Sequence, residues 1–177
     1  ILNHWGLWRA ERGLEAGEKY RAAIGHFDQA VAAEPGDAEA WSRRAVVWIN
    51  WAVLINRGGE DSRAQLERAL ADLDRAVGIN PNDPETWTSR ANVRTNLAVQ
   101  AQARGEDPTG NYERAIADLG RALELNPERA ETWTRRGEAR SNWSVYRSAR
   151  GEDVRSLLDE ALADLLRATE LNPRQAE

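Results

Sequence analysis

Four prolines recur along this chain at a fixed interval of 46 residues, at Pro35, Pro81, Pro127 and Pro173. Tryptophans and alanines keep the same interval, at Trp41, Trp87 and Trp133 and at Ala69, Ala115 and Ala161. A sequence that repeats itself at a period of this length folds as an array of similar units, and each unit buries its apolar face against its neighbours. The repeat therefore has to be explained before any single motif.

The period divides the chain into three complete units and a partial one. The complete units span residues 35–80, 81–126 and 127–172, and residues 173–177 form a short tail. Residues 1–34 match the last three-quarters of an earlier unit, with Gly13 in the place of Gly59. Because the chain starts inside a repeat and without Met, we expect it to be a piece of a longer array, arranged as one continuous domain.

Each unit carries the start and stop signals of two helices. In the second unit, Asp83 followed by Pro84 is typical of a helix start, and Gly105 is typical of the residue that ends a helix. Asp107-Pro108 repeats the start signal, and Pro127 cannot continue the second helix. The sequence thus predicts an all-α fold of about eight helices in antiparallel pairs.

The second unit resembles the tetratricopeptide repeat, a pair of helices 34 residues long. Its Trp, its small residues and its closing Pro match the family pattern at Trp87, Ala91, Ala115, Leu119, Ala122 and Pro127. The resemblance implies a right-handed helical solenoid. Each unit here is about twelve residues longer than the family's, and we expect both helices to carry the extra length. The first helix should then have about 20 residues, or roughly 30 Å.

One family position departs from the pattern in every unit. The resemblance implies Leu three residues after the Trp, but this chain has Arg44, Arg90 and Arg136. We predict that these arginines pair with the aspartates in the same register, Asp72, Asp118 and Asp164. Trp51 and Trp143 recur on the added length of the first helix. Either they fill the core, or they form an apolar anchor for a partner.

In the family, the first helices line a concave groove that binds partner proteins, and this implies a set of candidate binding residues. The candidates are Arg43, Asn50, Thr88, Asn92, Asn96, Thr134, Arg135 and Asn142. The in-register asparagines have two readings: they hydrogen-bond the backbone of a bound peptide, or they bridge neighbouring helices. Glu138 would repel an anion, so a clamp for a peptide's terminal carboxylate is not supported.

Several function classes have no basis in the sequence. The chain has no Cys, and its two His lie on different predicted helices without a nucleophile or metal ligand in register. No glycine-rich phosphate loop is present. We therefore expect no enzymatic activity, no metal and no cofactor. A net charge of −5 argues against nucleic acid, and no apolar run is long enough for a membrane helix. The absence of Cys favours a cytoplasmic setting.

These features predict a protein-interaction scaffold that binds an extended or helical peptide segment in its groove. One alternative is self-association through the terminal helices, because the last predicted helix carries Leu157, Leu158, Leu162, Leu165 and Leu166. Another is an engineered array without a natural partner. The uneven divergence between the units and the preference for Arg over Lys argue against the engineered array.

Overall fold

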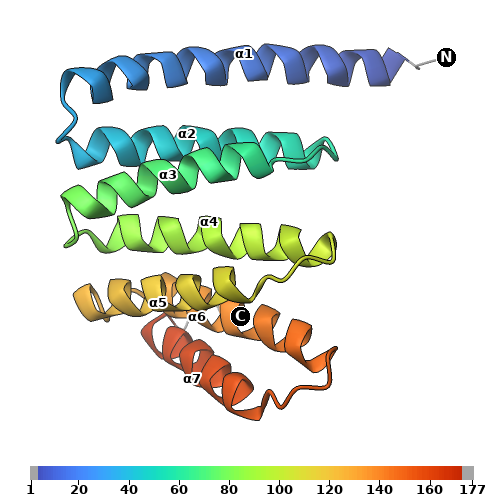
Figure 1. The fold of residues 1–177 in the computed structure, drawn as a ribbon, viewed down its shortest axis with the longest axis vertical. Helices are drawn as coiled ribbons and strands as arrows, with labels where there is room; N and C mark the ends of the chain where they lie inside the picture. Colours follow the sequence, from blue (N-terminus) through green and yellow to red (C-terminus); the bar gives the residue numbers. More distant parts are fainter. Residues whose placement is uncertain (1–3, 173–177) are drawn as a thin grey trace. The chain divides into compact units, whose positions relative to one another are not determined.

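The computed structural model describes residues 4–172, with side chains from residue 15 onward. Within these residues the chain forms seven α-helices and no strand, so the predicted all-α class is confirmed (Figure 1). The helices are α1 His4–Ala33, α2 Ala38–Arg57, α3 Arg63–Ile79, α4 Pro84–Ala103, α5 Thr109–Leu125, α6 Ala130–Ser148 and α7 Arg155–Leu171. The predicted tail, residues 173–177, lies outside the described residues.

The chain divides into two compact units, Ile1–Asn80 and Pro81–Glu177. In the first compact unit, α2 packs against both α1 and α3. In the second, α4 pairs with α5, α6 pairs with α7, and α5 also packs against α6 (Figure 1). The core of the second unit includes a fully buried cluster of small and aliphatic side chains from three of its helices: Ala91, Ala115, Leu119 and Ala139.

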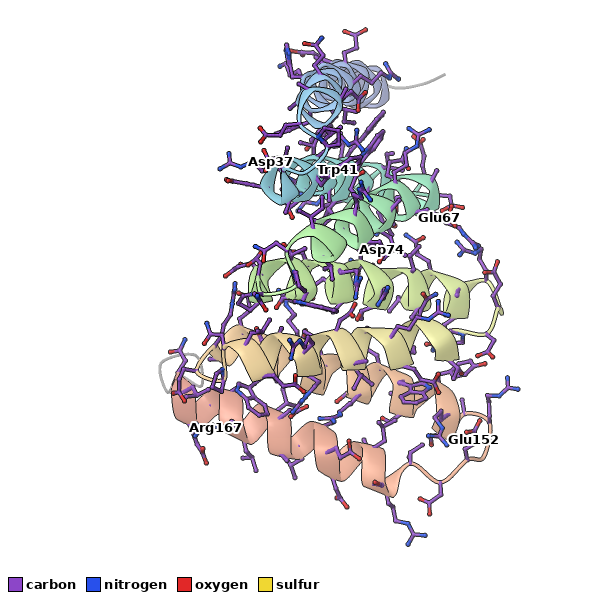
Figure 2. All side chains as sticks on the ribbon, turned by 60° about the vertical axis from the view of Figure 1, so that its left-hand side comes forward. Asp37, Trp41, Glu67, Asp74, Glu152 and Arg167 are labelled. Atoms are coloured by element: carbon purple, nitrogen blue, oxygen red, sulfur yellow. The ribbon has the colours of Figure 1, made fainter. Side chains whose placement is uncertain are left out.

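The first helices begin and end where the local signals predict. The Asp83 carboxylate accepts the backbone N–H groups of Glu85 and Thr86 at 3.1 and 3.2 Å, and Pro84 is the first residue of α4. Asp37, which lies at the start of α2 (Figure 2), caps that helix in the same way. Gly59, Gly105 and Gly151 adopt φ values of +81°, +74° and +77° in the turn after each first helix. At 20, 20 and 19 residues, α2, α4 and α6 have the predicted length.

Helix starts differ from the prediction in two ways. Helix α5 begins at Thr109, one residue after the expected Pro108, and Asp107 accepts the Thr109 N–H at 3.0 Å. Helix α6 has Arg129 in the position of the capping aspartates, and no side chain caps it. An arginine has no acceptor oxygen to offer the free N–H groups of the first turn, so the cap is lost there.

The partial repeat at the N-terminus does not form a helix pair. Gly13 matches the turn glycines by position, yet α1 continues through it from His4 to Ala33. The complete units place Asp two residues after the turn glycine, whereas the partial repeat has Glu15 there. Glu is a poor helix cap and a good helix former, so nothing in this stretch starts a second helix. The predicted helix pair within residues 1–34 is therefore wrong.

A recurring contact joins the two helices of each complete unit. The Trp87 Nε1 donates to the carbonyl oxygen of Pro81 at 2.9 Å, and the Arg90 guanidinium lies 4.6 Å from the centre of the Trp87 ring. Arg90 then donates Nε and one terminal nitrogen to the two carboxylate oxygens of Asp118, at 3.0 and 2.7 Å. We call this set the joint; its other copies are Pro35, Trp41, Arg44 and Asp72, and Pro127, Trp133, Arg136 and Asp164.

The predicted Arg–Asp pairs are thus confirmed in all three units, and they are more buried than exposed surface pairs. Asp118 is 4% exposed and also accepts from Arg94 at 2.6 Å. Asp164 accepts from Arg140 as well as Arg136. The side-chain hydrogen bond to Asp72 is the main cause that raises the pKa of Arg44 above its ordinary value. Planar, doubly bonded pairs of this kind fix the angle between two helices.

In the first complete repeat, residues 35–80, a tryptophan occupies the position of Arg94 and Arg140. Trp48 stacks on Trp51 with a centroid distance of 5.5 Å, and Trp51 stacks in turn on Tyr20 of α1 at 6.2 Å. The Arg68 guanidinium lies 4.7 Å from the Trp48 ring centre. The added length of α2 therefore places the half-buried Trp51 in an aromatic layer against α1.

Candidate functional site

Helices α4 and α6 are the first helices of two consecutive repeats, and they contact each other within the second unit. Near their N-terminal ends the hydroxyl oxygens of Thr88 and Thr132 lie 3.4 Å apart, both buried. Farther along, the two helices leave a pocket of about 330 Å³ between them. The two helices thus touch near their N-terminal ends and leave the pocket farther along. We call this face the α4–α6 surface.

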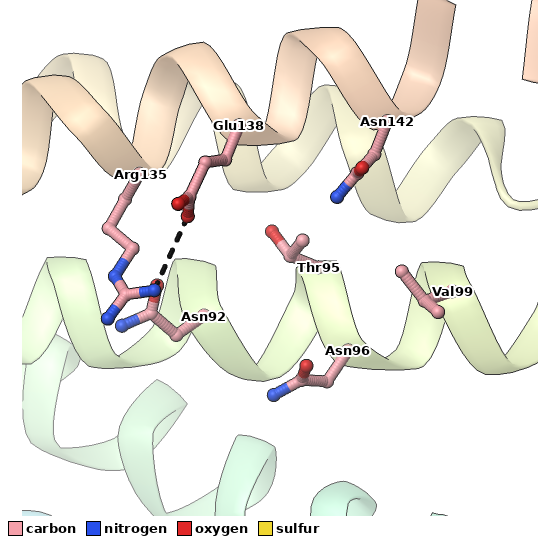
Figure 3. Close-up of a pocket in the computed structure, with 7 residues that line it drawn as sticks. All are labelled: Asn92, Thr95, Asn96, Val99, Arg135, Glu138 and Asn142. Atoms are coloured by element: carbon pink, nitrogen blue, oxygen red, sulfur yellow. Dashed lines mark hydrogen bonds and ion pairs between the residues drawn. The ribbon is translucent and has the colours of Figure 1, made fainter. Parts of the chain in front are cut away.

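The pocket is lined almost entirely by polar side chains from these two helices (Figure 3). Four of the eight predicted binding residues meet here: Asn92 and Asn96 on α4, and Arg135 and Asn142 on α6. Thr95 and Val99 of α4 and Glu138 of α6 complete the lining. Positions far apart in the sequence are thus brought together in one pocket.

The three pocket asparagines have unused hydrogen-bonding groups. Among the described residues, no side chain or backbone group is hydrogen-bonded to the amides of Asn92, Asn96 or Asn142, and Asn96 and Asn142 are exposed. The reading in which the in-register asparagines Asn96 and Asn142 bridge neighbouring helices is therefore not what the structure shows. Each free amide offers both a donor and an acceptor, which is the complement of a peptide backbone.

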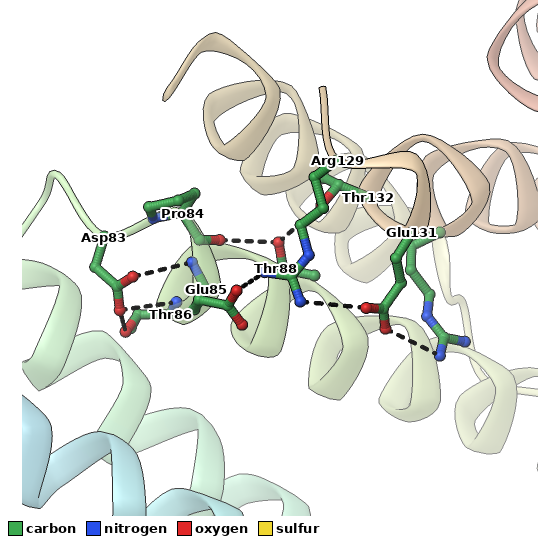
Figure 4. Close-up of polar contacts among 9 residues, drawn as sticks. Asp83, Pro84, Glu85, Thr86, Thr88, Arg129, Glu131 and Thr132 are labelled. Carbon is green, nitrogen blue, oxygen red and sulfur yellow. Dashed lines mark hydrogen bonds and ion pairs between the residues drawn. The ribbon is translucent and has the colours of Figure 1, made fainter. Parts of the chain in front are cut away.

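The charged groups beside the pocket form a chain of ion pairs. Arg135 lies between two carboxylates of its own helix, 3.3 Å from Glu138 and 3.6 Å from Glu131. Arg129 pairs with Glu131 at 3.2 Å and with Glu85 of α4, so it links the two first helices (Figure 4). At the position where α2 and α4 have a capping aspartate, Arg129 therefore connects α6 to α4 and does not cap α6.

The other predicted binding residues lie elsewhere. Arg43 and Asn50 are on α2 in the first unit, where Arg43 pairs with Glu39 of the same helix. Thr88 is only 4% exposed and its hydroxyl donates to the Pro84 carbonyl at 2.8 Å. The Thr134 hydroxyl donates to the carbonyl of Ala130 at 3.2 Å. Both hydroxyl groups donate within their own helices, and neither threonine lines the pocket.

Sequence reasoning did not single out Thr95 and Val99 as pocket residues. A signal for Val99 was available, because Val53, Val99 and Val145 recur at the 46-residue interval, each three residues after a recurring asparagine. All three are exposed, at 43%, 45% and 64%. Valine is a mediocre helix former, so its repeated presence on an exposed helix face indicates a role outside the core.

No group of three or more His, Asp or Glu side chains is placed to hold a metal ion between residues 15 and 172. In the described part of the chain, every helix is too short or too polar to span a membrane.

Comparisons with known proteins agree with the helix pairs described above. A family profile described as tetratricopeptide repeat matches residues 12–50 and 101–140. No curated protein sequence matches the chain.

Solved structures share the fold at low sequence identity. A fragment of MamA from Desulfovibrio magneticus RS-1 is 16% identical over 96% of this chain and 76% of its own, with a TM-score of 0.61. TTC0263, a thermophilic tetratricopeptide-repeat protein in Thermus thermophilus, is 23% identical over 95% of this chain and 92% of its own, with a TM-score of 0.52. The chain thus shares the fold of tetratricopeptide-repeat proteins, and two of its regions match the tetratricopeptide-repeat profile.

Proposed function

We propose that this protein is an interaction scaffold that binds a peptide segment of another protein along the α4–α6 surface. Tetratricopeptide-repeat proteins generally bind proteins or peptides and as a rule are scaffolds rather than enzymes. The observation that carries the proposal is the pocket with three unpaired amides among the described residues. An extended backbone offers donors and acceptors that such amides can satisfy without regard to its side chains.

The added helix length supports the same function. Asn96 and Asn142 lie beyond the middle of 20- and 19-residue helices, and Val99 lies one turn further along α4. A shorter repeat would end its first helix soon after these positions. The lengthened helices therefore extend the polar surface on which a segment of several residues can lie.

A capture experiment tests this proposal. The immobilised protein is compared with the variant Asn96→Ala/Arg135→Ala/Asn142→Ala, and proteins retained from a lysate are identified by mass spectrometry. We expect at least one protein to be held by the first and lost by the second. Asn111→Ala on α5, which lies outside the pocket, is the matched control and should retain the same protein. Equal retention by the native protein and the triple variant, with unchanged helicity, would refute the proposal.

A second candidate is self-association through α7. Four leucines of this helix are exposed, by 36% to 57%: Leu158, Leu162, Leu165 and Leu166. The residues 46 positions before the first and third of these are Tyr112 and Leu119 of α5, which are 0% and 1% exposed in a helix that packs against α6. Leucines that continue a buried pattern yet stay exposed favour contact with an apolar surface, here the same face of a second copy.

The test of this second candidate is the oligomeric state. Light scattering over a range of concentrations should show a dimer for the native protein and a monomer for Leu162→Glu/Leu166→Glu. The exposed pair Val46→Glu/Val53→Glu on α2 is the control and should leave the dimer intact. A native protein that stays monomeric at high concentration excludes self-association.

A further inference from the structure

The ion pairs that run from the first turns of α4 and α6 to the pocket contain one more carboxylate than guanidinium groups. Three carboxylates of α4 and α6, those of Glu85, Glu131 and Glu138, share two guanidinium groups, those of Arg129 and Arg135. The two contacts of Arg135, 3.3 and 3.6 Å, are longer than the roughly 2.8 Å of a strong charge-assisted hydrogen bond. Glu138 is therefore only weakly neutralised, and half of its side chain is exposed at the pocket.

The opposite side of the pocket is uncharged. Asn96 and Thr95 offer neutral polar groups, and Val99 offers an exposed aliphatic surface one turn after Asn96. Along α4 the pocket thus presents the Asn92 and Asn96 amides and then Val99, and the Glu138 carboxylate of α6 points towards Asn92 and Arg135 (Figure 3).

We infer that the segment bound here is basic: an extended peptide with a Lys or Arg side chain against Glu138 and a short aliphatic side chain over Val99. This rests on the proposed function, because the backbone of the segment is held by the Asn96 and Asn142 amides. The basic group would complete the charge balance that Arg135 leaves incomplete. An acidic segment or a terminal carboxylate would meet Glu138 without a free cation beside it, since Arg135 is already shared by two carboxylates.

A phage-displayed library of random dodecapeptides is the probe for this inference. The native protein and Glu138→Gln are each used to select peptides, and the enriched sequences are compared with the unselected library. We expect Lys or Arg with a neighbouring Val, Ile or Ala to be enriched on the native protein. On Glu138→Gln the basic preference should be lost while the aliphatic preference remains. The best native-selected peptide should bind Glu138→Gln about threefold to fivefold more weakly, as expected for one exposed ion pair.

Two further variants separate this inference from the proposed function. Glu124→Gln removes a carboxylate of similar exposure on α5, outside the pocket, and should leave the selection unchanged. Asn96→Ala/Asn142→Ala should weaken all selected peptides, whatever their charge, because it removes the backbone contacts. Enrichment of acidic or uncharged peptides that depends on the two asparagines would overturn the basic-segment inference and leave the peptide-binding function standing. Enrichment of no peptide, or of peptides indifferent to both asparagines, would overturn both.

Discussion

Asp118 is the side chain on which the polar contacts of the second repeat converge. It is 4% exposed and binds two arginines of α4, Arg90 and Arg94, from its place on α5. In a buried Arg–Asp pair, the attraction between the two charges offsets the free-energy cost of removing each from water. Loss of the aspartate therefore leaves the cost of burying the arginine without this compensation. Asp118 should therefore matter far more to stability than the many exposed ion pairs of this surface.

Replacement of Asp118 by Ala should lower the free energy of unfolding by about 3–5 kcal/mol, because two guanidinium groups lose their buried partner. The control is Glu124→Ala on the same helix, whose pair with Arg121 is exposed at both side chains. That change should stay within about 0.5 kcal/mol. Urea denaturation of both variants measures the difference, and similar losses would contradict the structural role of the joint.

Tyr112 contributes a buried hydroxyl group that no group among the described residues satisfies. The corresponding positions in the first and third units hold Leu66 and Leu158. Burial raises the pKa of Tyr112 above its ordinary value of 10.0. The tyrosine is therefore kept neutral in the folded protein at a pH where it ionises in the unfolded chain.

Tyr112→Phe should raise the free energy of unfolding by about 1 kcal/mol, because it removes an unsatisfied polar group and keeps the ring. It should also change the pH dependence. The contribution of a group with a raised folded pKa is complete below the unfolded pKa, near 10, and is lost as the pH rises through the folded pKa. Denaturation curves recorded from neutral pH to about pH 11 should differ in their pH dependence between the native protein and the variant; parallel curves would contradict the burial argument.

The sequence predicted contacts between residues correctly where a constant spacing within the repeat decides which side chains meet. The Arg–Asp pairs followed from a constant separation of 28 residues in each unit. The sequence could not indicate that Thr88 is buried, because this depends on how closely α4 approaches α6 at Thr132. Offsets counted from a tryptophan give the direction of a side chain but not the distance to the next helix.

At the level of elements, glycines in the same sequence serve opposite purposes. Gly105 has a φ of +74° and ends the turn after α4, whereas Gly120 lies inside α5 with room for a methyl group. Punctuation of this kind made the complete units predictable from their sequence. The structure of the partial repeat was not predictable in this way, because it has the turn glycine, Gly13, without the aspartate that starts the next helix.

Gly105→Ala should lower the free energy of unfolding by about 1 kcal/mol, because an L-residue is strained at this positive φ. Gly120→Ala should raise it by about 0.5–1 kcal/mol, since alanine favours a helix interior and its added methyl group meets Arg136 only at ordinary contact distance. Thermal denaturation followed by circular dichroism compares the two. If both variants are destabilised alike, the turn glycine has no special role.

At the scale of the whole molecule, stability is distributed along the chain. Within each compact unit, helices pack mainly against the helices that precede or follow them in the sequence. The free energy of such an array is close to a sum of repeat and neighbour terms, and its parts can open separately. A local defect should accordingly stay local.

Asp164→Ala should lower the protection of backbone amides in α6 and α7 against hydrogen exchange by a large factor, because Arg136 and Arg140 lose their buried acceptor. Amides of α2 and α3, in the other compact unit, should exchange at the native rate. Hydrogen exchange followed by mass spectrometry of peptic fragments measures both. Equal loss of protection everywhere would mean that the chain unfolds as one cooperative block.

The joint and the turn glycines lie at opposite ends of each helix pair. Trp87 and Arg90 are in the first half of α4, Asp118 is in the second half of α5, and Gly105 marks the far turn. Whole helical turns can therefore be inserted or deleted beside the glycine without any change to the residues that fasten the pair. Selection, or a protein engineer, can thus adjust the breadth of the surface offered to partners independently of the chemistry that keeps the repeats folded.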